Sequence, residues 1–181
     1  MKKTIVIFDS KYGSTKRYAQ WIAEELGADL TARKDADPGS LGSYDVIVYG
    51  GGLYAGGVSG ISFITKNFEQ IKDKKILLFT CGLGDPNVPE NVENIRKGLD
   101  KALPDEMRDV IEIFHLRGGM DYSKLSLLHR SMMSMVRKAV EKKDPATRTQ
   151  EDIQMLETFG KSVDFTDRGT IKPLIQKALE E

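Results

Sequence analysis

The sequence predicts one α/β domain built on a doubly wound parallel sheet, and three observations support this prediction. Short and nearly continuous apolar segments, such as Ile5-Val6-Ile7-Phe8, are typical of strands that helices cover on both faces. Amphipathic helical segments alternate with these strands along the chain. Polar or glycine-rich segments follow three of the strands, and in such a sheet they would meet at the edge that binds ligands.

The elements are expected in a regular order along the 181 residues. Gly27 provides a C-terminal stop for the first helix, whose stripe of Tyr18, Ile22 and Leu26 predicts a buried face. Five strands are predicted, at 3–9, 28–32, 45–50, 75–81 and 110–116. Helices are predicted at 15–26, 61–70, 89–103, 123–143 and 149–165, followed by a short tail. We expect residues 1–181 to form a single domain, with 120–181 as an added helical segment on it.

Composition excludes several classes of protein. The 27 basic residues balance the 27 acidic residues, so charge provides no drive towards nucleic acid and does not suggest a strongly acidic electron shuttle. Cys81 is the only cysteine, which rules out an internal disulfide and predicts a cytoplasmic protein. No segment approaches the roughly 20 apolar residues of a membrane span.

The segment after the first strand has the composition of a phosphate-binding loop. Ser10, Ser14 and Thr15 carry hydroxyl groups, and Gly13 allows close approach of the backbone and a positive φ. The helix that follows would point free N–H groups at the same place. The loop lacks the patterns of a Walker A or a dinucleotide-binding motif. The alternative is a plain helix cap, which would account for one hydroxyl but not for three.

This part of the chain resembles the phosphate loop of the flavodoxin family. It consists of a strand, the segment Ser-Lys-Tyr-Gly-Ser-Thr and a helix. The resemblance covers residues 1–119 and implies the strand order 2-1-3-4-5. It implies flavin mononucleotide (FMN) as the cofactor, with the phosphate held by Ser10, Lys11, Tyr12, Gly13, Ser14 and Thr15.

The same resemblance implies that the loops after the third and fourth strands hold the flavin ring. The matching positions are Gly52, Leu53, Tyr54, Ala55 and Gly56, and then Thr80, Cys81, Gly82, Leu83, Gly84 and Asp85. Tyr54 is the best candidate to stack on the ring. Many flavodoxins carry a second aromatic residue in the later loop, whereas here Leu83 forms the wall or the flavin face stays open. Turn chemistry would explain any one of these glycines alone.

Three further residues have chemically active side chains. Cys81 is expected to be a small buried residue, since a redox thiol requires a lowered pKa. His115 lies in the last predicted strand and His129 in a predicted helix, with no second ligand at metal spacing. We therefore expect structural roles for both histidines and no metal site.

The C-terminal third resembles a particular group within the flavodoxin-domain family. The segment 117–122 and the basic, methionine-rich helix after it are similar in pattern and order to the menaquinone-dependent protoporphyrinogen dehydrogenases. This resemblance implies an enzyme that oxidises a porphyrinogen and reduces a quinone. The chain departs from the group at Leu53-Tyr54-Ala55, where those dehydrogenases tend to carry an arginine–tyrosine pair.

The predicted helix 123–143 is strongly basic on one side and apolar on another. One interpretation is a lid on the flavin site or a peripheral contact with an anionic membrane surface. The other, favoured because most amphipathic helices face a core, is a helix that packs on the domain.

Three functions therefore follow from the sequence. The leading hypothesis is an FMN oxidoreductase that passes electrons from a reduced substrate to a quinone or another acceptor. The second is an electron-transfer flavodoxin, a carrier with no substrate of its own. The third is a regulator on the same fold that binds no flavin.

Overall fold

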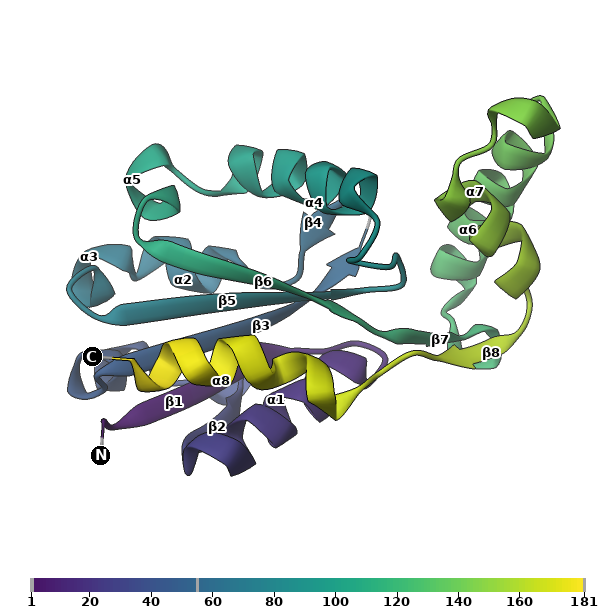
Figure 1. Cartoon of the computed structure of the whole chain (residues 1–181). Helices are drawn as coiled ribbons and strands as arrows, with labels where there is room; N and C mark the ends of the chain where they lie inside the picture. The colour runs from purple at the N-terminus through teal and green to yellow at the C-terminus, as the bar shows by residue number, and fades with distance from the viewer. Residues whose placement is uncertain (1, 55, 181) are drawn as a thin grey trace.

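A five-stranded parallel sheet forms the centre of the protein. The computed structural model describes residues 2–54 and 56–180. The sheet has the order β2-β1-β3-β5-β6, which confirms the predicted arrangement of the five parallel strands (Figure 1). Its strands are β1 (Thr4–Asp9), β2 (Asp29–Ala32), β3 (Val46–Tyr54), β5 (Lys75–Gly82) and β6 (Ile111–Arg117). The short strand β4 (Gly57–Val58) pairs antiparallel with the end of β3.

Helices cover both faces of this sheet, as the continuous apolar strands predict. One face packs against α1 (Ser14–Leu26) and α8 (Lys172–Leu179). The other face packs against α2 (Ser62–Lys66), α3 (Phe68–Ile71), α4 (Pro89–Ala102) and α5 (Asp105–Arg108). Val6 and Ile7 are fully buried on opposite faces, and burial of each such side chain stabilises the fold by about 1.5–3 kcal/mol.

The glycines of β3 belong to the strand, and the prediction that this strand ends at Gly50 is wrong. β3 continues to Tyr54, with Gly51 opposite Thr80 and Gly52 opposite Cys81 on β5. A Cβ at Gly50 would overlap the ring of Phe79 on the neighbouring strand, and one at Gly51 would overlap Val58 of β4. These glycines therefore leave room for large neighbours while their backbones still form the ladder.

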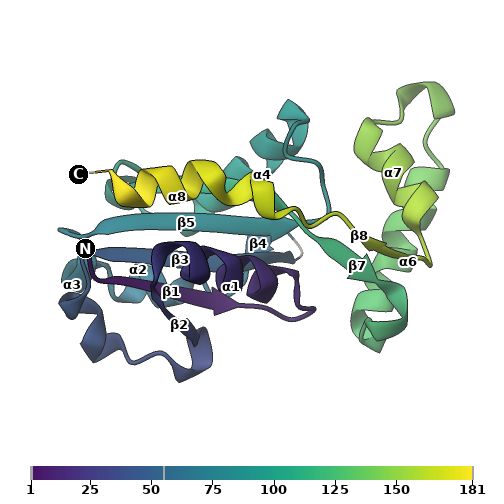
Figure 2. The same cartoon turned by 60° about the horizontal axis from the view of Figure 1, so that its bottom comes forward.

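The C-terminal third also differs from the prediction. The expected tail contains α8, which lies beside α1 on the sheet and completes that layer (Figure 2). The inserted segment before α8 consists of β7 (Gly119–Asp121), α6 (Leu127–Glu141), α7 (Gln150–Thr158) and β8 (Ser162–Asp164). β7 and β8 pair antiparallel, so the predicted helix 149–165 ends early and gives way to a strand.

The inserted segment extends beyond the carboxyl ends of the parallel strands (Figures 1 and 2). It therefore lies next to the loops that follow β1, β3 and β5. The predicted helix 61–70 is divided into α2 and α3. Short 3-10 helices also occur at Arg33–Asp35, Pro38–Ser43, Tyr122–Lys124, Pro145–Thr147 and Arg168–Ile171.

Candidate functional site

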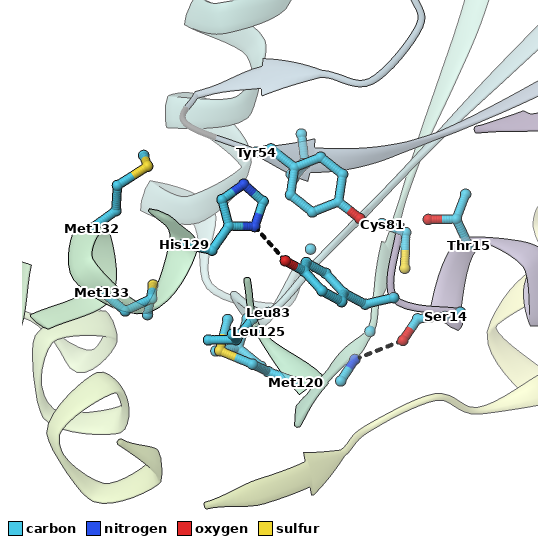
Figure 3. Close-up of a pocket in the computed structure, with 16 residues that line it drawn as sticks. Ser14, Thr15, Tyr54, Cys81, Leu83, Met120, Leu125, His129, Met132 and Met133 are labelled. Carbon is cyan, nitrogen blue, oxygen red and sulfur yellow. Dashed lines mark hydrogen bonds between the residues drawn. The ribbon is translucent and has the colours of Figure 1, made fainter. Parts of the chain in front are cut away.

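A cavity of about 180 Å³ lies between the carboxyl ends of the strands and α6. Its walls come from five parts of the chain, and side chains of these parts converge on one space (Figure 3). The lining residues are Tyr12, Gly13, Ser14, Thr15, Leu53, Tyr54, Cys81, Gly82, Leu83, Gly118, Gly119, Met120, Leu125, His129, Met132 and Met133.

The loop from Ser10 to Thr15 leads into the N-terminus of α1 without a side-chain cap. Gly13 occupies the N-cap position with a φ of 103°, and no side chain caps the helix. The hydroxyl groups are used elsewhere: Ser10 Oγ accepts a hydrogen bond from Gly13 N at 3.1 Å, and Ser14 Oγ accepts one from Gly119 N at 3.1 Å. The structure therefore does not support the helix-cap alternative. The first N–H groups of α1 remain available for an anion.

Three aromatic side chains form one wall of the cavity. Tyr12 Oη lies 2.5 Å from His129 Nδ1. The rings of Tyr54 and His129 are stacked, with centroids 5.8 Å apart and an interplanar angle of 20°. Tyr54 Oη accepts a hydrogen bond from Lys11 N at 3.3 Å, and burial raises the pKa of Tyr54. The prediction of a purely structural role for His129 does not account for this position, because the side chain lines the site.

The turn that leaves β6 closes the cavity from a third side. A Cβ at Gly118 would lie 2.9 Å from Cys81 Sγ, so only glycine lets this turn approach β5 so closely. Arg117 holds the neighbouring loop, because its Nε donates to Leu83 O at 3.3 Å and its guanidinium pairs with Asp85 at 3.2 Å. The same guanidinium lies over the ring of Phe165, 3.9 Å from its centroid.

Cys81 is buried in this wall, as predicted. Burial raises the pKa of its thiol to about 12, although a hydrogen bond with Thr15 acts in the opposite direction. The thiol is therefore uncharged at neutral pH. In the described ranges, no three acidic, histidine or cysteine side chains cluster as a metal site would require.

The predicted site residues are divided between two cavities and their surroundings. The predicted residues that line the first cavity are Tyr12, Gly13, Ser14, Thr15, Leu53, Tyr54, Cys81, Gly82 and Leu83. Gly56 and Gly84 line a second, adjoining cavity. The predicted residues that line neither cavity are Ser10, Lys11, Gly52, Thr80 and Asp85. Ala55 lies outside the described residues.

Some residues of the site are not predicted by the sequence patterns. Gly118, Gly119 and Met120 belong to a segment that stands out only through a family resemblance. Leu125, His129, Met132 and Met133 come from the inserted segment, whose apolar and basic pattern does not indicate which face meets the sheet.

α6 is less buried than we expect of an amphipathic helix that packs on the domain. Leu128 and Met135 are each 68% exposed, and Val140 is the buried residue of this helix. The expectation that its apolar face packs on the domain is therefore wrong for most of that face. The part of the chain that the structure describes contains no helix with the length and apolarity to cross a membrane.

The protein is a flavodoxin-like α/β protein, as defined by its strand order, the open N-terminus of α1 and the loops around that N-terminus. Residues 5–147 match the flavodoxin domain family, and the chain belongs to that family. No curated protein matches the chain.

Several solved structures are similar to this chain at low sequence identity. A flavodoxin, WrbA-like protein from Agrobacterium tumefaciens is 23% identical over 64% of this chain and 83% of its own, with a TM-score of 0.43. A flavoprotein from Lactobacillus acidophilus, solved in complex with FMN, is 18% identical over 65% and 93%, with a TM-score of 0.40. A flavodoxin from the domain Archaea is 14% identical over 87% and 93%, with a TM-score of 0.44.

Proposed function

We propose that this flavodoxin-domain protein binds FMN in the first cavity and is an oxidoreductase. Electrons would pass from a reduced substrate to a quinone or another acceptor. The observation that carries the proposal is the N-terminus of α1, which has Gly13 in a left-handed conformation and no side-chain cap. A phosphate monoester needs several donors in a small space, and this loop provides them.

The residues of the site fit the parts of FMN. Nothing described lies within 4 Å of a Cβ built at Gly13, so the space beside the loop is open to a phosphate. Leu53, Tyr54, Leu83 and Met120 offer an apolar wall for a flat ring. FMN would supply the redox chemistry, while these side chains bind the ring, orient it and exclude water.

The stacked rings of Tyr54 and His129 restrict where the flavin ring can lie. Insertion of a third ring between them needs about 7 Å, twice the contact distance of about 3.5 Å. The observed separation of 5.8 Å is too small. We therefore expect FMN either to lie outside this pair or to displace His129 and α6 as it binds.

Two features favour an enzyme over a carrier. The inserted helices α6 and α7 lie over the carboxyl edge of the sheet, where they restrict access to the cavity and provide additional walls (Figure 1). The net charge of zero does not provide the acidic surface that steers a carrier to basic partners.

The resemblance of 117–143 to protoporphyrinogen dehydrogenases supports porphyrinogen as a candidate substrate, whereas Leu53 departs from that group.

A peripheral contact between α6 and an anionic membrane belongs to the same proposal. Leu127, Leu128 and Met135 are exposed along α6, and Lys138 and Lys142 lie at its C-terminal end. Sedimentation with anionic vesicles tests this contact, with binding expected at low salt and lost at high salt. Absence of binding at low salt would contradict it.

One series of measurements tests the function. The purified protein is titrated with FMN and its visible spectrum recorded, with saturable binding expected. The photoreduced protein is then offered a soluble quinone, and the oxidised protein is offered a porphyrinogen. Turnover of either compound supports an enzyme, whereas reduction by a partner flavoprotein without turnover supports a carrier. Absence of FMN binding would contradict the whole proposal.

A further inference from the structure

A second cavity of about 510 Å³ lies between α4, the end of β6 and the inserted helices α6 and α7. It shares five lining residues with the first cavity, namely Leu53, Gly82, Leu83, Met120 and Met133. The two cavities are therefore neighbours across one common wall. A molecule in the second cavity would lie next to one held in the first.

The walls of the second cavity are mainly apolar and large enough for an organic molecule. Ile95 of α4, Leu116 of β6, and Val136, Val140 and Met155 of the inserted segment line it. Pockets that hold small organic ligands have volumes of about 300–1,000 Å³ and similar apolar walls with a few polar groups. The size and composition of this cavity fit such a ligand.

His115 lines this cavity and carries a buried polar atom without a partner among the described residues. Its Nδ1 lies 2.8 Å from Thr80 Oγ1, and its Nε2 is buried without a hydrogen-bond partner among the described residues. Burial lowers the pKa of His115, and the charge of Arg96 lowers it further. A buried polar atom of this kind is normally satisfied, so it points to an oxygen of a ligand or a water molecule.

The charged side chains that line the cavity disfavour an anion. Glu151 and Asp152 line it, and no described lining residue is a lysine or arginine. Lys143 lies close by, yet its Nζ is held by both carboxylate oxygens of Asp152 at 2.9 and 2.7 Å. Glu151 thus remains as an uncompensated carboxylate that would repel a second one.

We propose that the second cavity binds an uncharged, mainly apolar aromatic compound whose oxygen substituent hydrogen-bonds to His115 Nε2. The inference rests on the proposed function, because a conjugated ring beside FMN is suited to exchange electrons with it. It goes further by selecting the substrate class of this cavity. The inference narrows the candidate substrates of the proposed function, because a porphyrinogen with several carboxylates would not occupy this cavity.

A matched pair of probes tests the selection. The FMN-loaded protein is titrated by calorimetry with 2-naphthol, which is uncharged at neutral pH, and with 2-naphthoate, which is an anion of similar shape. We expect 2-naphthol to bind more tightly and to shift the NMR signals of residues in α4 and α7. His115→Phe should weaken 2-naphthol binding about three- to tenfold, the value of one net hydrogen bond, with FMN affinity unchanged.

Variants of the inserted helices separate charge from shape. Glu151→Gln should reduce the preference for 2-naphthol over 2-naphthoate, while Glu157→Gln, an exposed residue of the same helix, should leave it unchanged. Val136 lines the cavity and is 47% exposed, so Val136→Trp should be tolerated and should block 2-naphthol. This variant keeps the test valid if His115→Phe fails to fold.

The outcomes distinguish failure of this inference from failure of the proposed function. Equal or tighter binding of 2-naphthoate, or no effect of either His115→Phe or Val136→Trp, would overturn the inference. Displacement of 2-naphthol by FMN would also overturn it, because the cavity would then belong to the cofactor. A protein that binds FMN but neither probe retains the proposed function and loses the inference. If FMN itself does not bind, the same titrations of the free protein still decide whether the cavity selects an uncharged ligand.

Discussion

Tyr12 Oη lies 2.5 Å from His129 Nδ1, which joins the loop after the first strand to a helix 117 residues later in the chain. Two further contacts converge on the same imidazole. Lys11 Nζ lies 3.4 Å from Nε2, and the ring of Tyr54 stacks against the histidine ring. The side chains of Tyr12, Tyr54 and His129 therefore both hold α6 against the domain and line the first cavity.

Removal of the His129 ring should loosen α6. We expect His129→Ala to increase amide hydrogen exchange in 127–141, since it removes both the hydrogen bond and the stacking contact. Tyr12→Phe should have a smaller effect, and a double-mutant cycle should give a coupling of about 1 kcal/mol, the usual size of one hydrogen bond. FMN should also associate faster with His129→Ala if α6 has to move. Ser131→Ala, on the exposed side of α6, serves as the control. Unchanged exchange in His129→Ala would show that α6 is held by other contacts.

The left-handed conformation of Gly13 allows a test of the phosphate loop. Gly13 has a φ of 103° and Gly160 has a φ of 77°, and a Cβ added to either glycine would have no described atom within 4 Å. Each glycine-to-alanine substitution should lower the free energy of unfolding by about 1–3 kcal/mol through backbone strain. Urea unfolding measures this loss. Only Gly13→Ala should also weaken FMN binding, whereas an equal loss in Gly160→Ala would show that the effect on FMN is indirect.

The strands and the position of the site can be predicted because both depend on local patterns, whereas the strand order is implied only by the family resemblance. Apolar runs define the strands, and the polar segments after them are brought together by the topology alone. The end of β3 cannot be predicted in this way. Gly51 and Gly52 have the composition of a turn, and only the structure shows that they pair with Thr80 and Cys81 on the adjacent strand.

The C-terminal third is harder to predict for two different reasons. α8 has an apolar stripe of Ile171, Leu174 and Ala178, so the sequence does contain its pattern, but the helix is short and that stripe is correspondingly brief. The pairing of β7 with β8 has no local pattern, because each strand has three residues and 40 residues separate Asp121 from Ser162. Contacts of this kind depend on how the inserted helices fold between the two strands.

The burial of Cys81 predicts an unreactive thiol. Because burial raises the pKa of this thiol to about 12, the reactive thiolate is rare at pH 8. We expect native protein to react with a thiol reagent more than about a hundredfold more slowly than protein unfolded in urea. A Cys81→Ser variant provides the blank for the assay. Rapid reaction of the native protein would show that the cavity wall opens around β5, and it would contradict the assignment of Cys81 as a buried structural residue.

The ion pair between Arg17 and Asp164 predicts how stability changes in acid. A hydrogen bond from Arg17 and another from Thr166 N lower the pKa of Asp164 to about 2. The unfolded chain, with an aspartate pKa of about 3.9, then binds more protons than the native protein between about pH 4 and pH 2. The contribution of Asp164 to stability is therefore complete above about pH 4 and is lost as the pH falls towards 2.

Asp164→Asn should abolish this part of the acid dependence. Urea unfolding at several pH values should show a lower stability of the variant at pH 7 and a shallower decline between about pH 4 and pH 2. Both side chains of the pair are about half exposed, so salt should weaken the effect. Asp73→Asn, an exposed aspartate without an ion-pair partner in the described part of the chain, is the matched control and should retain the wild-type slope. Because Asp164 ends β8 and Arg17 lies in the first turns of α1, an unchanged slope in Asp164→Asn would mean that the inserted segment is attached to α1 by other contacts.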